Sequence, residues 1–119
     1  MKDRIESTIL TNLIYNEEYL RKVLPHIEPD YFDNRIERVL FEEVSQFIAK
    51  YDKLPSQEII SIEIKNRTDL TQDEYSDALK IVSLLVPQEI NQSWLLDSTE
   101  KWCKDRAIYL ALMESIRIA

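Results

Sequence analysis

The side chains best suited to catalysis are scarce in this sequence and do not form a recognisable set. His26 and Cys103 are its one histidine and its one cysteine, so no zinc site of Cys and His ligands can be assembled. A Cys–His nucleophile pair would require these two residues to meet in the fold. His26 follows Pro25 in an expected turn, which favours a surface or capping role, and Cys103 is interpreted as a packed thiol. A single cysteine cannot form an intramolecular disulfide, in agreement with a reducing compartment.

Pairs of adjacent carboxylates are the second candidate for chemistry. The sequence holds three of them, Glu17/Glu18, Glu42/Glu43 and Asp73/Glu74. Acid–base catalysis by two carboxyl groups requires that both converge in a cleft with separated pKa values, whereas adjacent helical residues diverge by about 100°. The first and last pairs stand at expected helix N-termini, where acids are stabilising, and Glu42/Glu43 are expected on the outer side of a helix. We therefore predict no catalytic, cofactor-binding or metal-binding residue in this chain.

The absence of glycine excludes a further group of functions. The sequence contains 0 glycines in 119 residues. Phosphate-binding loops need glycine where backbone amides turn inward without a Cβ in the way, so neither a Walker A loop nor a dinucleotide fingerprint can exist here. Tight Asn-Gly hairpin turns are missing as well, which argues against a β fold.

The charge balance also disfavours direct binding of DNA or RNA. The formal net charge is −7, and no basic stretch offsets the repulsion of phosphates. Trp94, Trp102 and Tyr109 could stack on bases, but the basic residues around them alternate with acidic ones, which favours a core or interface role. No apolar run approaches the roughly 20 residues of a membrane span, so no membrane partner is expected.

Hydrophobic periodicity predicts an all-α fold, a compact bundle of about five to six helices. The central helix is expected within residues 34–56, where Asn34 is a good N-cap and Pro55 cannot continue a helix. Its apolar residues cover an arc of roughly 200°, so it should be packed on two sides. The other helices are expected over residues 2–15 with Asp3 near the start as a cap, and over 16–24, 57–66, 71–87 and 91–119. The alternation of isoleucines within 57–66 leaves a strand as the alternative there.

The C-terminal stretch is the part expected to contact other molecules. Of the last thirteen residues all but Glu114, Ser115 and Arg117 are apolar, and a helix that is apolar on most sides is buried on most sides. We therefore predict a globular bundle over residues 1–90 and a long helix over 91–119. This helix should pack against another chain, against sequence beyond Ala119, or against both. The expected interface residues are Trp102, Tyr109, Leu112, Met113 and Ile116.

Several short motifs, taken in order, carry a resemblance that covers nearly the whole chain. They are Glu6…Ile9-Leu10…Leu13-Ile14, Asn16-Glu17-Glu18-Tyr19, Pro29-Asp30-Tyr31-Phe32, Val39-Leu40-Phe41, Leu54-Pro55-Ser56, Ser93-Trp94-Leu95, Thr99-Glu100-Lys101 and Arg106-Ala107. Each motif alone is weak evidence, because similar residues occur in many capped amphipathic helices. Their order and spacing together resemble the N-terminal domain of DnaB-type hexameric replicative DNA helicases, closest to the T4-like phage branch.

This resemblance implies the first domain of a longer, ATP- and Mg-dependent 5′→3′ helicase whose motor lies beyond Ala119. The implied role is oligomerisation into a ring collar, with dimer pairing inside a hexamer, together with contacts to primase and to a helicase loader. The residues from 91 onward would form the first arm of a helical hairpin. DNA would be contacted only through the absent motor, and the implied location is the cytoplasm of the host cell. No catalytic residue is implied for this chain.

Two other classes of function stay open from the sequence. A free-standing adaptor, such as a helicase loader or the helicase-binding domain of a primase, would show a complete last helix and a 1:1 complex with a helicase. A small all-α enzyme that uses scattered carboxylates would show a deep pocket with two converging acids.

Overall fold

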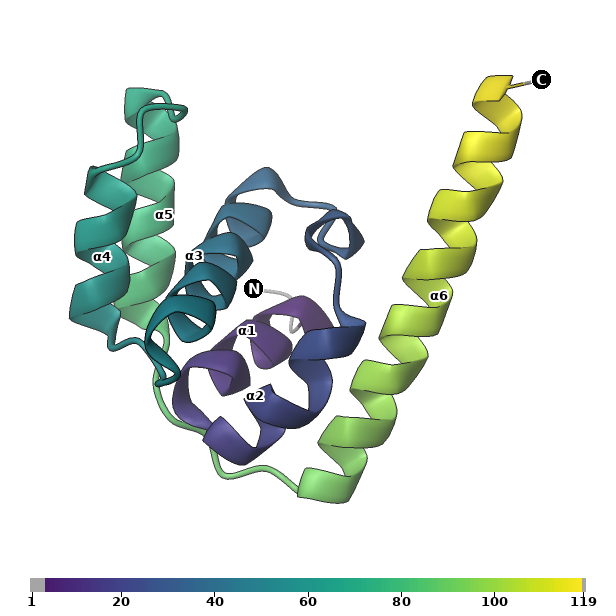
Figure 1. The fold of residues 1–119 in the computed structure, drawn as a ribbon, viewed down its shortest axis with the longest axis horizontal. Helices are drawn as coiled ribbons and strands as arrows, with labels where there is room; N and C mark the ends of the chain where they lie inside the picture. Colours follow the sequence, from purple (N-terminus) through teal and green to yellow (C-terminus); the bar gives the residue numbers. More distant parts are fainter. Residues whose placement is uncertain (1–3, 119) are drawn as a thin grey trace.

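Helices are the regular secondary structure of the residues that the structure, a computed structural model, describes, 4–118 (Figure 1). The α-helices are α1 (Ile5–Tyr15), α2 (Glu17–Val23), α3 (Arg35–Tyr51), α4 (Gln57–Lys65), α5 (Gln72–Leu84) and α6 (Gln92–Ile118), and two 3-10 turns are η1 (Leu24–His26) and η2 (Pro29–Tyr31). The all-α fold class is confirmed, and the strand alternative for 57–66 is wrong because α4 occupies that segment. The expected cap Asp3 lies outside the described residues.

Side-chain caps fix where most of these helices begin. The side chains of Asn16, Asn34 and Ser56 each accept a hydrogen bond from a backbone N–H in the first turn of α2, α3 and α4. Thr71 and Glu74 form a reciprocal capping box at the start of α5, with both hydrogen bonds present at 2.9 and 3.2 Å. These bonds satisfy donors that have no partner inside the helix, and the starts expected from the sequence are confirmed.

α3 is the central helix, and it packs against α1, α4, α5 and η2. It ends at Tyr51, before Pro55 is reached, because Asp52 adopts a left-handed conformation with φ of 56°. Aspartate tolerates this region better than most residues other than glycine. One expectation for α3 is wrong, because Glu43 is buried rather than on the outer side; Tyr51, the last residue of the helix, is exposed.

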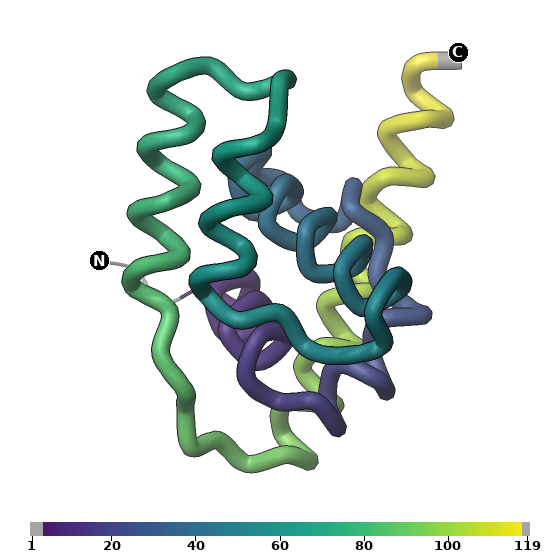
Figure 2. The backbone as a smooth tube through the Cα atoms, turned by 60° about the vertical axis from the view of Figure 1, so that its left-hand side comes forward, coloured from purple at the N-terminus to yellow at the C-terminus, as the bar shows by residue number. Residues whose placement is uncertain are grey.

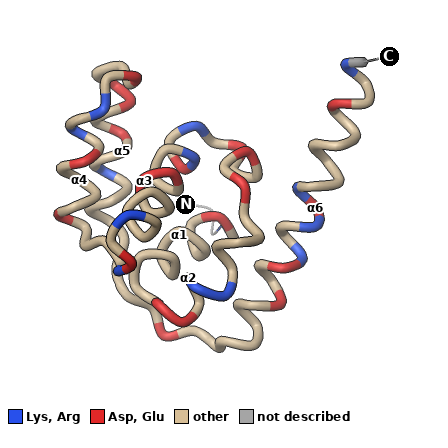
Figure 3. The backbone as a smooth tube through the Cα atoms, in the orientation of Figure 1, with Lys and Arg blue, Asp and Glu red and all other residues tan. Residues whose placement is uncertain are grey.

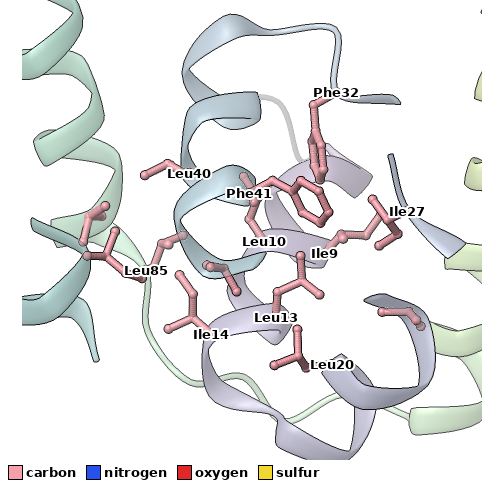
Figure 4. Packing of buried hydrophobic residues seen from close by; sticks show 14 of the residues in the cluster. Ile9, Leu10, Leu13, Ile14, Leu20, Ile27, Phe32, Leu40, Phe41 and Leu85 are labelled. Atoms are coloured by element: carbon pink, nitrogen blue, oxygen red, sulfur yellow. The ribbon is translucent and has the colours of Figure 1, made fainter. Parts of the chain in front are cut away.

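The hydrophobic core centres on α1 and α3, and the other α-helices and the segment that joins α2 to α3 add buried residues to it (Figure 4). α1 contributes Ile9, Leu10, Leu13 and Ile14, whose spacing places them on one side of a helix. Phe32, delivered by the turn at η2, is fully buried and lies 5.3 Å from Phe41 between ring centroids. The Pro29–Phe32 motif therefore supplies one core aromatic outright, while Tyr31 is only partly buried.

An ionic cluster explains why Glu43 is buried. Arg67, in the loop after α4, donates to Glu43 at 2.7 Å, to Glu42 at 3.1 Å and to Asp69 at 2.7 Å. A buried carboxylate is tolerated when a charged donor satisfies it. Arg67 thus joins the α4–α5 pair to α3. The adjacent acids Glu42 and Glu43 are the acceptors on α3.

Asp69 should make the stability of this junction dependent on pH. Hydrogen bonds from Arg67 lower the pKa of Asp69 from 3.8 to about 2. Because the folded-state pKa is the lower one, the stabilisation is complete above about pH 4 and is lost as the pH falls toward 2. Titration of the Asp69 carboxyl carbon by NMR should show a midpoint near 2, and Arg67→Met should move the midpoint back toward the ordinary value. A midpoint near 4 in the unchanged protein would contradict the ion pair.

Candidate interaction surface

The first half of α6 is part of the core of its own chain. α6 packs against α1, α2 and η2, and its residues Leu95, Thr99 and Trp102 are buried there. The Thr99 hydroxyl lies 2.6 Å from the Tyr19 hydroxyl, a hydrogen bond that joins α6 to α2. Burial raises the pKa of Tyr19 to about 12, so its hydroxyl remains protonated and able to donate. Of the large apolar residues in this half of α6, Trp94 is exposed and Leu96 is partly exposed.

Trp102 requires a correction to the predicted interface. It was expected between chains, but its side chain is only 6% exposed within the single chain. Its ring lies 4.9 Å from that of Phe32 and 6.0 Å from that of Tyr31, and its indole N–H donates to Glu6 at 3.3 Å. Helical periodicity correctly identified Trp102 as a residue that must be covered, but periodicity does not reveal which part of the protein covers it.

Within the described part of α6, Arg106 is the last residue with a polar contact to the body of the protein. Its Nε donates to the backbone carbonyl of Tyr31 at 2.6 Å, and its guanidinium lies 4.8 Å from the centroid of the Tyr109 ring. Beyond this point α6 stands clear of the other helices, as both Figure 1 and Figure 2 show. The second half of α6 is therefore exposed on most of its sides.

The second half of α6 carries a continuous apolar surface, here called the distal apolar surface. Its members are 41–68% exposed, and they are Ile108, Tyr109, Leu112, Met113 and Ile116. Their spacing covers an arc of about 140° on the helix. Together they expose on the order of 500 Å², the size of patch that in monomeric proteins often marks an interaction site. Figure 3 shows that charged residues follow the first half of α6 and are few on the second.

Four of the five expected interface residues thus lie on this surface, and whether another chain covers them remains a prediction. Ile108 was missed because it falls outside the stripe that contains Trp102 and Tyr109. The recurrence of Ile108, Leu112 and Ile116 at four-residue intervals was the signal that could have identified it.

A groove of about 480 Å³ lies between α2–η1 and α6, here called the α2–α6 groove. Its apolar lining includes Val23, Tyr31, Leu96, Cys103 and Ala107. Its charged lining includes Lys22 on the α2 wall and the acids Asp97 and Glu100 on the α6 wall. The groove runs along α6 up to the residue that precedes the distal apolar surface.

The α2–α6 groove brings His26 and Cys103 to one place, but not as a catalytic pair. Both residues line the groove, yet no hydrogen bond joins them among the described residues. Burial raises the pKa of the Cys103 thiol to about 11, whereas a nucleophilic cysteine needs a lowered pKa. Nor do residues 4–118 contain a group of three or more His, Cys, Asp or Glu side chains placed to bind a metal ion. The geometry therefore supports no nucleophile or metal centre.

The fold is a compact all-α bundle with a long C-terminal helix, and comparison with known proteins identifies a similar protein. No family model matches the chain. The chain is similar to a DnaB-like replicative helicase of Enterobacteria phage T4, with 29% identity over 110 residues. The match covers 92% of this chain, which spans 23% of the length of that helicase. The resemblance to the T4-like branch of these helicases is therefore confirmed.

No helix in the described part of the chain is long and apolar enough to span a membrane.

Proposed function

We propose that this chain is an oligomerisation domain of a replicative DNA helicase and acts in DNA replication. The similarity to the T4 helicase supports the replication role. The distal apolar surface supports self-association, and the absence of glycine argues against a nucleotide-binding P-loop in the chain. ATP-driven unwinding would then reside in a motor domain outside these 119 residues, which would also supply the contacts to DNA.

The observation that carries this proposal is the change in character along one side of α6. Lys101, Asp105, Ile108, Leu112 and Ile116 follow one another at three- and four-residue intervals, so they lie on the same side of the helix. Lys101 and Asp105 are exposed and pair at 2.8 Å, as expected for a solvated surface. The next three members are aliphatic and equally exposed. A helix that stayed in water would keep the charged pattern, so the aliphatic half supports a cover supplied by another chain or by sequence beyond Ala119.

The first partner proposed for this surface is a second copy of the chain, as in the ring collars that the resemblance implies. Primase and a helicase loader are proposed as further protein partners, acting in the cytoplasm of the host cell. The even distribution of the −7 net charge supports protein rather than nucleic acid as the direct partner.

The solution mass of the chain, measured by light scattering over a range of concentrations, tests this proposal. A monomer has a mass of 14.2 kDa. We expect the mass to rise with concentration to twice this value or more. A monomer that persists at high concentration would contradict self-association. If that monomer formed a 1:1 complex with a replicative helicase, the chain would be an adaptor instead.

A further inference from the structure

We propose that a small pocket between α3 and α4, here called the α3–α4 pocket, binds an arginine side chain from a basic segment of a protein partner. The pocket has a volume of about 300 Å³ and is lined by Glu43, Gln46, Phe47, Lys50, Tyr51 and Glu63. In Figure 1, α4 and the second half of α6 lie on opposite sides of the molecule, so the pocket is separate from the distal apolar surface. This inference therefore goes beyond the proposed function and does not depend on self-association.

An aromatic pair on α3 lines the α3–α4 pocket. Phe47 and Tyr51 stand about one turn apart, with ring centroids 4.7 Å from each other. Tyr51 is exposed, and Phe47 is partly buried without belonging to the buried core. Aromatic faces attract cations, and an arginine guanidinium also stacks on them. The Lys50 ammonium already lies 5.3 Å from the centroid of the Tyr51 ring, so this ring is accessible to a cation.

Two carboxylates in the pocket can accept hydrogen bonds from the same cation. Glu43, on α3, is only 8% exposed, whereas Glu63, on α4, is exposed. Oε2 of Glu43 accepts a hydrogen bond from Arg67 at 2.7 Å, but its Oε1 accepts none from the described residues. A carboxylate can accept several donors on its two oxygens. Arg67 therefore fixes Glu43 in place and leaves one of its oxygens able to accept a further donor.

The chain itself does not balance the negative charge around the pocket. Arg67 is shared by three carboxylates, because it also donates to Glu42 and Asp69. Within residues 4–118, no ion pair joins Lys50 or Glu63 to a side chain of opposite charge. The whole chain carries a net charge of −7. A basic segment is therefore the partner whose charge complements this pocket.

The size and composition of the pocket favour arginine over other cations. Its volume lies at the lower end of the range of small-molecule pockets, about 300–1,000 Å³, which suits a single side chain. The described residues place no three His, Cys, Asp or Glu side chains for a metal ion. A guanidinium combines a plane that stacks on an aromatic ring with paired donors for carboxylates, whereas the ammonium of lysine has no such plane. Because Tyr51 and Glu63 are exposed, a segment of a protein partner can reach the pocket.

Titration of the isotope-labelled chain with short capped peptides, followed by NMR, tests this proposal. The probe is acetyl-Gly-Arg-Gly-amide, and the matched control peptide carries citrulline, which has the shape of arginine without its charge. We expect the arginine peptide, at about millimolar concentration, to shift the amide signals of Phe47, Tyr51 and Glu63, and the citrulline peptide to leave them unchanged. A lysine peptide should bind more weakly than the arginine peptide. Equal binding of the two, or shifts that spare these signals, would overturn the proposal.

Variants of exposed residues give a sharper test, because the fold should not depend on them. Tyr51→Leu should weaken binding of the arginine peptide about 3- to 10-fold through loss of the cation–aromatic contact, and Glu63→Gln about 2- to 5-fold. Lys50→Gln should strengthen binding about 2-fold, because it removes a competing cation. The matched control is Glu58→Gln, an exposed position on α4 outside the pocket lining, which should leave binding unchanged.

The variants also separate the pocket from general attraction to an acidic protein. Equal effects of Glu58→Gln and Glu63→Gln would show only such attraction and would overturn the pocket. Unchanged or weaker binding to Lys50→Gln would overturn it as well, since the peptide would then not take the place of that ammonium. None of these variants alters the distal apolar surface, so light scattering of each should give the mass of the unchanged chain. Failure of this proposal is thus distinguishable from failure of the proposed function.

Discussion

Replacement of Leu112 by Asp should abolish the proposed self-association of the chain and leave monomers that remain fully helical. Leu112 is 59% exposed in the single chain, so the folded monomer does not depend on it. In the assembly the new carboxylate would be removed from water beside Ile108 and Ile116, with no partner of opposite charge. An unpaired buried charge costs about 3–5 kcal/mol, which corresponds to an affinity about 10²–10⁴-fold weaker. Light scattering should give the monomer mass, and circular dichroism should give an unchanged helical signal.

The matched control for this substitution is Ser93→Asp, which adds the same charge to the same helix. Ser93 is exposed in the first turn of α6, where an acidic residue favours the helix. We expect this variant to associate like the unchanged chain. An oligomer mass that survives Leu112→Asp would remove the distal apolar surface from the interface. Loss of helical signal would instead show that Leu112 supports the fold of the monomer.

The helices could be predicted from the sequence because their starting signals are local. Asn16, Asn34 and Ser56 act on backbone groups two or three residues away, and the Thr71–Glu74 box closes within one turn. Each cap works in the same way whatever the remainder of the chain does. The all-α class and most helix boundaries follow from such signals together with hydrophobic periodicity.

The features that the sequence did not predict depend on residues far apart in the chain. Glu43 is buried because Arg67, 24 residues later, reaches it. α3 ends at the left-handed Asp52 before Pro55 is reached, and Arg21, 31 residues earlier, donates hydrogen bonds to the Asp52 side chain and carbonyl. Glu43 was expected on the outer side of its helix, and no expectation was made for Asp52. A buried ion pair becomes visible only when the packing of α3 against the α4–α5 pair is known.

The difference between the buried first half of α6 and its exposed second half also could not be predicted from the sequence. From the sequence, Trp102 and Tyr109 are equivalent, because they lie seven residues apart on one face. In the fold the segment around Phe32 covers the first, while the second extends beyond it. The α2–α6 groove is likewise formed by three separate segments, so its lining could not be listed before the fold was known. The candidate site therefore had to come from the structure, although four of its residues came from the sequence.

Trp102→Ala should destabilise the folded monomer by about 3–5 kcal/mol, the usual cost of truncating a large core aromatic. The substitution removes the ring that packs on Phe32 and the indole N–H that binds Glu6, so α6 loses its main attachment to η2 and α1. Urea denaturation of the Leu112→Asp variant, with and without Trp102→Ala, measures this loss without interference from association.

Trp94→Ala in the same background is the matched control, because Trp94 lies on the same helix but is 51% exposed. It should change stability by about 0.5 kcal/mol or less. Equal losses for the two tryptophans would mean that α6 is not anchored through Trp102. A loss confined to Trp102 would establish that the first half of α6 belongs to the body of the chain, leaving only the distal half to a partner.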